Sequence, residues 1–128
     1  LRFISEHNLS NRVAFLSGLE IEEMAAIYQS AQMLIYPSIF EGFGIPILEA
    51  LFSKTPVITS KGGCFSEAGG PTSKYISPLS VEQMKAAILE IQNSSDLQKE
   101  MQTKGFEYAQ NFTDDKIAKN LMEVYISL

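Results

Sequence analysis

MLIYPSIFEGFGIPILEALFSKTPVITS, residues 33–60, contains two continuous apolar runs separated by a turn and a helical pattern. The runs at 33–37 and 55–60 are typical of strands covered on both faces, as the strands of parallel sheets are. Residues 47–52 follow Pro46 and predict a helix, because proline is best tolerated in the first helical turn. A strand, a helix and a second strand joined by short loops predict a parallel α/β sheet.

The flanking sequence extends this alternation in both directions. We predict a helix over 1–9, a short strand at 13–16 (VAFL), a helix from Glu20 and a brief edge strand at 74–77. Three helices follow from Ser80, and we expect them to cover the sheet of a single domain. The last of these helices has an apolar stripe made of Ile117, Leu121, Val124 and Leu128.

Composition argues against several classes of partner. Of the 128 residues 45% are apolar and 20% charged, and the net charge is −5 with no cluster of basic residues. A nucleic-acid or anionic-membrane partner is therefore disfavoured. The single cysteine, Cys64, rules out an intrachain disulfide and is typical of a reducing compartment, so we expect a cytoplasmic protein. No apolar run approaches the ~18 residues of a membrane span. The chain starts at Leu1, and we expect it to be a fragment of a longer protein.

The loop between the first run and its helix has the composition of an anion site. Ligands of open α/β sheets bind beyond the carboxyl ends of the strands, where such loops lie. Gly42 and Gly44 let the backbone turn tightly and approach a ligand, and Pro46 starts the helix. The free amides of residues 43–48 would then point at a bound group, for which a phosphate is the usual occupant.

Two carboxylates, Glu41 and Glu49, flank this loop eight residues apart. In one continuous helix that spacing corresponds to a rise of ~12 Å. A glycosidase-type acid/base pair needs roughly 5–9.5 Å between its carboxyl groups, so two separate roles are favoured. A carboxylate accepts hydrogen bonds from hydroxyls, and a vicinal diol of a sugar matches its two oxygens. The alternative is a solvated loop carboxylate at Glu41 and an outward-facing helix residue at Glu49.

EGFGIPILEA at 41–50 resembles the E-x7-E motif of retaining, nucleotide-sugar-dependent glycosyltransferases of the GT-B fold, in the large family numbered 4 (glycosyl transferases group 1). The segments at 13–19, 27–38 and 50–63 are similar to the flanks of that motif, and nearly the whole chain is covered. The resemblance implies a Rossmann-like parallel sheet with flanking helices, the C-terminal half of a GT-B fold truncated at its N-terminal side. Residues 1–128 would be a partial nucleotide-sugar-binding domain, with the acceptor-binding N-terminal domain absent.

The resemblance also implies roles for individual residues. Glu49 would hold the ribose hydroxyls of the donor nucleotide, and Glu41 would orient the transferred sugar and is the candidate catalytic residue. Leu19 falls where an apolar residue covers the nucleobase, and the amides of Phe43 to Ile45 would reach the sugar or the distal phosphate. No metal and no cofactor beyond the donor is implied. The expected donor-binding residues are Leu19, Glu41, Gly42, Phe43, Gly44, Ile45 and Glu49.

A full-length enzyme of this kind would transfer a hexosyl group to an acceptor sugar, lipid or glycan, in polysaccharide or glycolipid biosynthesis. Peripheral association with the inner face of a membrane would be compatible with that role. The isolated fragment is predicted to be inactive. One alternative is a non-catalytic nucleotide-binding or interaction module derived from this fold; another, a sugar-nucleotide epimerase, would need catalytic acids that the chain does not show.

Four further residues carry weaker signals. Lys61 follows a strand and could touch a phosphate, although a lone loop lysine is usually solvated. Glu67 either holds its loop or contacts the donor. His7 is expected at the surface, and Cys64 lacks a matched base for nucleophilic catalysis.

Overall fold

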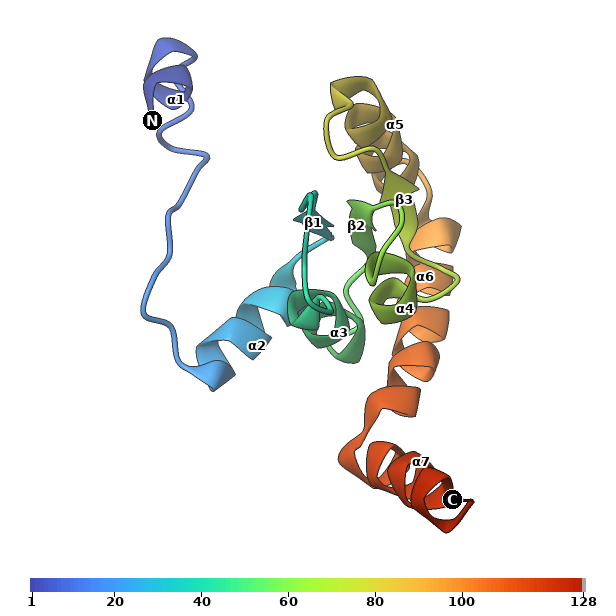
Figure 1. Ribbon diagram of the computed structural model, residues 1–128. Helices are drawn as coiled ribbons and strands as arrows, with labels where there is room; N and C mark the ends of the chain where they lie inside the picture. The colour runs from blue at the N-terminus through green and yellow to red at the C-terminus, as the bar shows by residue number, and fades with distance from the viewer. Residues whose placement is uncertain (128) are drawn as a thin grey trace.

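A parallel sheet of three strands organises the chain, in the order β1, β2, β3 (Figure 1). The computed structural model describes residues 1–127. Its strands are β1 (Leu34–Tyr36), β2 (Val57–Ser60) and β3 (Lys74–Ile76). Leu34 is paired with Val57, and Ile58 with Lys74, both in parallel register. The predicted parallel α/β fold is confirmed, including the edge strand expected near residue 74.

Helices precede, connect and follow these strands. In chain order they are α1 (Arg2–Glu6), α2 (Ile21–Ser30), α3 (Ile45–Phe52), α4 (Phe65–Gly69), α5 (Val81–Gln92), α6 (Ser95–Ala109), the 3-10 turn η1 (Gln110–Phe112) and α7 (Asp114–Ile126). Helix α3 connects β1 to β2, and α4 connects β2 to β3. The short helix α4 lies inside residues 61–70 (KGGCFSEAGG), a segment whose four glycines are typical of a loop.

The core lies on both faces of β2, because successive side chains of a strand point to opposite sides. Val57 packs with residues of α3, α4 and the end of α6, whereas Ile58 packs with residues of β3, α5 and α6. All four residues of β2 are buried, as the continuous apolar run predicted. Thr59 and Ser60 are part of this buried strand and satisfy their hydroxyls by donating to the backbone of the β1 segment.

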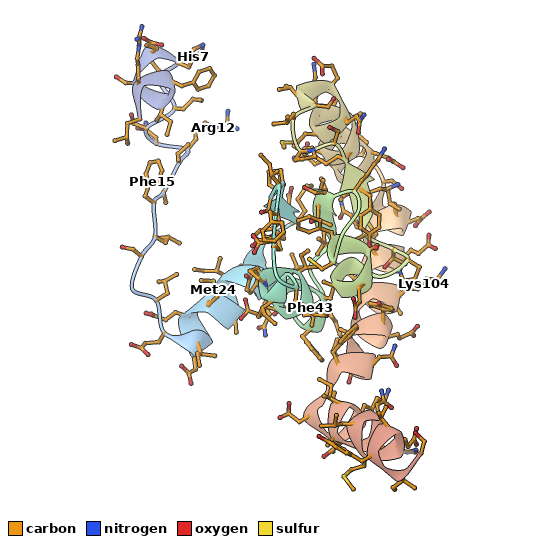
Figure 2. All side chains as sticks on the ribbon, in the orientation of Figure 1. His7, Arg12, Phe15, Met24, Phe43 and Lys104 are labelled. Atoms are coloured by element: carbon orange, nitrogen blue, oxygen red, sulfur yellow. The ribbon has the colours of Figure 1, made fainter. Side chains whose placement is uncertain are left out.

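Two expectations about the ends of the chain are wrong. Residues 13–17 form no strand; they run as extended chain apart from the sheet, and Phe15 is 72% exposed (Figure 2). A strand needs a hydrogen-bonding neighbour, and the sheet ends at β1. Helix α7 projects away from the sheet and has no buried residue, so α5 and α6 alone of the terminal helices cover the sheet (Figure 1). In its predicted stripe Leu121 is 55% exposed, and Leu128 lies outside the described residues.

Candidate functional site

The loop after β1 turns into α3 at Gly44, which is the N-cap of that helix and has a φ of 103°. This left-handed conformation is one that glycine adopts readily and other residues rarely do. Gly42 differs from the expectation, because its backbone is outside the left-handed region and a Cβ there would meet nothing within 4 Å. The turn therefore requires glycine at Gly44 only, and the open space at Gly42 is available to a ligand.

The N-terminus of α3 offers fewer amides than the sequence suggested. Pro46 has no N–H, and the amide of Ile47 donates to the carbonyl of Gly44 at 2.9 Å. The candidate donors to a ligand are therefore the backbone amides of Phe43, Gly44 and Ile45. The Phe43 side chain is half-buried, and its ring packs against Phe112 with centroids 5.7 Å apart.

Glu41 is half-buried in this loop and is held by a tyrosine from β1. The Tyr36 hydroxyl donates to Glu41 Oε1 at 2.6 Å. This hydrogen bond, with a smaller effect of Ser38, lowers the pKa of the Glu41 carboxyl. It also raises the pKa of Tyr36 to about 12, because the phenol is the donor to a negative acceptor. Glu41 is therefore ionised at neutral pH and can accept hydrogen bonds.

Glu49 lies one turn into α3, and it is exposed although its neighbours Leu48 and Ala50 are buried. The Tyr28 hydroxyl, from α2, donates to Glu49 Oε2 at 3.1 Å. Burial and the adjacent Glu49 charge raise the pKa of Tyr28 to about 12. The carboxylate inside the apolar helix pattern thus faces outward, toward α2.

A cavity of about 400 Å³ opens between α2 and α3. The chain before α2 is fixed at this cavity by a capping box, in which the Glu20 amide donates to Glu23 Oε2 at 2.9 Å. Leu19 and Glu49, 30 residues apart in sequence, both line it. Its walls are mostly apolar with the one carboxylate of α3 among them, and its lining residues are Leu19, Glu20, Ile21, Met24, Ala25, Tyr28, Glu49, Phe52 and Ser53.

The remaining expected site residues do not line this cavity. Glu41, Gly42, Phe43, Gly44 and Ile45 lie in the loop at the end of β1 and at the first turn of α3. The candidate site therefore has two parts, which share α3: the cavity beside its flank, and the loop at its N-terminus.

The residues with weaker signals have local roles. The Nδ1 atom of His7 lies 3.0 Å from the Phe3 carbonyl, and in Figure 2 His7 stands far from Phe43. The Lys61 side chain is exposed, and the Glu67 carbonyl accepts a hydrogen bond from Tyr108 at 2.6 Å. Cys64 Sγ lies 3.4 Å from the Glu41 carbonyl, which makes it a neighbour of the loop.

Residues 1–127 contain no cluster of histidine, cysteine, aspartate or glutamate able to hold a metal ion. Nor does any helix within this range have the length and apolar character required to cross a membrane.

Sequence reasoning missed both tyrosines. Tyr28 lies in the helix predicted from Glu20, and Tyr36 in the apolar run at 33–37 that predicts a buried strand. Each pattern gives only the face on which the ring lies. A hint for Tyr36 was its position five residues before Glu41 at a strand end, but Tyr28 and Glu49 come together only through the packing of α2 on α3.

The chain is similar to known proteins in sequence and in fold. Residues 2–108 match the family described as Glycosyl transferases group 1. The chain is 36% identical over 90 residues to the MMP alpha-(1->4)-mannosyltransferase of Mycolicibacterium hassiacum, over 68% of this chain and 22% of that protein. It is 36% identical over 95 residues to the O-antigen chain mannosyltransferase RfbU of Salmonella typhimurium, over 74% of this chain and 27% of that protein.

Among solved structures, sucrose-phosphate synthase from Thermosynechococcus elongatus superposes with a TM-score of 0.87 at 28% identity, over 98% of this chain and 32% of that one. The chain therefore spans no more than about a third of the length of these three relatives. The family match includes the whole strand–helix–strand unit at 33–60, and the family expected from EGFGIPILEA is confirmed. This chain belongs to the glycosyl transferases group 1 family.

Proposed function

We propose that this chain is the donor-binding part of a glycosyltransferase that moves a sugar from a nucleoside diphosphate sugar to an acceptor hydroxyl with retention at the anomeric carbon. The observation that carries the proposal is the cavity between α2 and α3, which joins Leu19 to Glu49 along the flank of α3. Family membership supports sugar transfer in glycan biosynthesis. Two relatives are mannosyltransferases by name, which supports a hexose as the transferred group.

The cavity has the size and chemistry for a nucleoside. A volume of about 400 Å³ is within the usual range of small-molecule sites, which are mostly apolar with a few placed polar groups. Leu19 offers an apolar contact to the base, and Glu49 offers two acceptor oxygens to the ribose hydroxyls. Tyr28 already uses Oε2, so we propose that Oε1 takes the main hydrogen bond from the sugar ring.

The diphosphate would lie at the first turn of α3. The partial positive charge of a helix N-terminus and its unpaired amides favour an anion there, and the open space at Gly42 allows close approach. As the bond to the transferred sugar breaks, negative charge grows on the departing phosphate. Fixed amides at Phe43 to Ile45 would stabilise that charge without rearrangement.

Glu41 would bind hydroxyls of the transferred sugar. Tyr36 occupies Oε1 of this carboxylate, and we propose Oε2 as the atom that faces the sugar. In this role Glu41 orients the reacting carbon against the phosphate, which lowers the barrier through positioning. We place the acceptor site outside this chain and predict that residues 1–128 alone transfer no sugar.

Calorimetric titration of the chain with UDP, GDP, ADP and their hexose conjugates tests the proposal. We expect one nucleotide series to bind, and Glu49→Ala to weaken it about tenfold, since a hydrogen bond to a charged group contributes roughly 1.5 kcal/mol at an exposed site. Glu107→Ala, which removes the same charge from an exposed position on α6, is the matched control and should bind as the wild type does. Absence of binding to all three series would refute the proposal and favour a non-catalytic module.

A further inference from the structure

Both carboxylates of the candidate site accept a hydrogen bond from a tyrosine that belongs to another element. Tyr36 of β1 donates to Glu41 at 2.6 Å, and Tyr28 of α2 donates to Glu49 at 3.1 Å. Glu41 lies half-buried in a loop, and Glu49 lies on the exposed side of a helix. A glutamate has three rotatable side-chain bonds, and a single fixed donor removes much of that freedom.

The backbone of each tyrosine is in turn held by a buried threonine, which lies within β2 in one case and just before β2 in the other. Thr59 Oγ1 donates to the Tyr36 carbonyl at 3.0 Å, and Thr55 Oγ1 donates to the Tyr28 carbonyl at 2.6 Å. Both threonines are at most 1% exposed. The same series of contacts, from threonine to tyrosine backbone and from tyrosine hydroxyl to carboxylate, therefore occurs twice. One series starts within β2, at Thr59, and the other two residues before β2, at Thr55.

The other half-buried tyrosines near the core are arranged differently. Tyr75 donates to the Gly70 carbonyl and Tyr108 to the Glu67 carbonyl, each at 2.6 Å. Those hydroxyls satisfy backbone groups away from the site, as a purely structural role requires. Within residues 1–127, the tyrosines that donate to carboxylates are the two at the site, Tyr28 and Tyr36.

We propose that Tyr36 and Tyr28 are positioning residues, which act through Glu41 and Glu49 respectively and fix the two carboxylates for different parts of the donor. The inference rests on the proposed function. It assigns Tyr36 to the transferred sugar and Tyr28 to the nucleoside, and so predicts that the two hydroxyls affect different ligands. Donors held in place before binding raise affinity because less freedom is lost when the ligand arrives.

The test compares Tyr36→Phe and Tyr28→Phe with Tyr75→Phe, a control that loses one hydroxyl outside the site. Each chain is titrated with UDP, GDP and ADP, and with UDP-glucose, GDP-mannose and ADP-glucose. We expect Tyr28→Phe to weaken a nucleotide and its sugar conjugate alike, by about three- to tenfold. Tyr36→Phe should weaken only the conjugate by a similar factor, and Tyr75→Phe neither.

A double-mutant cycle adds a readout that a general loss of stability would not reproduce. If Tyr36 acts through Glu41, Tyr36→Phe weakens the conjugate no further once Glu41→Ala is present. Independent, additive losses would overturn the assignment. The assignment would also be overturned if Tyr36→Phe weakened binding of the nucleotide and of its sugar conjugate equally. The same holds if Tyr36→Phe and Tyr28→Phe both bound these ligands with the affinity of Tyr75→Phe.

A ligand-free measurement separates this inference from the proposed function. Carboxyl ¹³C NMR follows the titration of Glu41, and Tyr36→Phe should raise its pKa because the main cause of the lowering is removed. An unchanged Glu41 titration in Tyr36→Phe would overturn the positioning role even if the nucleotides bind. Failure of the wild-type chain to bind any nucleotide, with the expected NMR change present, would instead refute the proposed function.

Discussion

The exchange of glycine for alanine at two positions of one loop distinguishes a glycine that the fold requires from one that a ligand requires. Gly44→Ala puts a Cβ at a φ of 103° and 3.0 Å from Ile47 Cδ1. Ile47 is fully buried, so its side chain has little room to move away. Backbone strain of this kind costs about 1–3 kcal/mol, and the crowding adds to it. A domain of this size should therefore lose roughly 4–12 °C in Tm.

Gly42→Ala adds the same methyl group in the same loop without either penalty. No atom would lie within 4 Å of the added Cβ, and the φ of Gly42 is outside the left-handed region. We expect the free energy of unfolding to change by less than about 0.5 kcal/mol, whereas sugar-nucleotide affinity falls because the methyl group enters the proposed ligand space. Urea unfolding followed by circular dichroism measures the first quantity, and calorimetry the second. Equal stabilities of the two variants would refute the reasoning.

Three further predictions use the same unfolding assay. The pKa of Glu41 in the folded chain lies below its ordinary value of 4.5. Its hydrogen bond from Tyr36 therefore stabilises the fold fully above pH 4.5, and this stabilisation is lost as the pH falls through the lowered pKa. Tyr36→Phe lacks the bond and should lose less stability on acidification than the wild type does. Leu51→Ala, at a side chain 2% exposed, should destabilise the chain by about 2–5 kcal/mol. Ser94→Ala removes the side-chain cap of α6, whose Oγ accepts from the Leu97 amide at 3.1 Å, and should cost about 1 kcal/mol. Ser95→Ala, one residue later, lacks that contact and serves as its control.

The central unit of the fold was predictable because its signals are local. The runs at 33–37 and 55–60 are apolar at nearly every position, and burial on both faces of a parallel sheet produces that pattern. The run at 13–16 looks similar but is exposed, with Leu16 at 60%. Whether a short apolar run becomes a strand depends on a neighbouring strand, which the run itself does not specify.

The sequence also indicated which residues form the loop and its flanking carboxylates, but not the contacts that these side chains make. Gly44 and Pro46 mark a helix start in sequence and in structure alike. The contacts of Glu49 could not be foreseen, because Tyr28 reaches it from 21 residues away across two packed helices. Helical periodicity places the Tyr28 ring on the packed side of α2, but it says nothing about the atom that its hydroxyl meets at the far end.

The separation of Glu41 from Glu49 now has a firmer physical basis than their spacing in sequence. The spacing argument assumed a continuous helix, but α3 begins at Ile45, after the left-handed turn at Gly44. Glu41 therefore belongs to the loop between β1 and α3, and Glu49 to the flank of α3 that faces α2. Each has its own tyrosine donor, and of these two glutamates only Glu49 lines the cavity between α2 and α3. Because the two carboxylates have separate donors, a substitution at one tyrosine can change the position of its own glutamate without affecting the other. If Glu41 binds the transferred sugar and Glu49 the nucleoside, as we propose, substitutions at Tyr36 change sugar selection and leave the nucleoside contact unchanged.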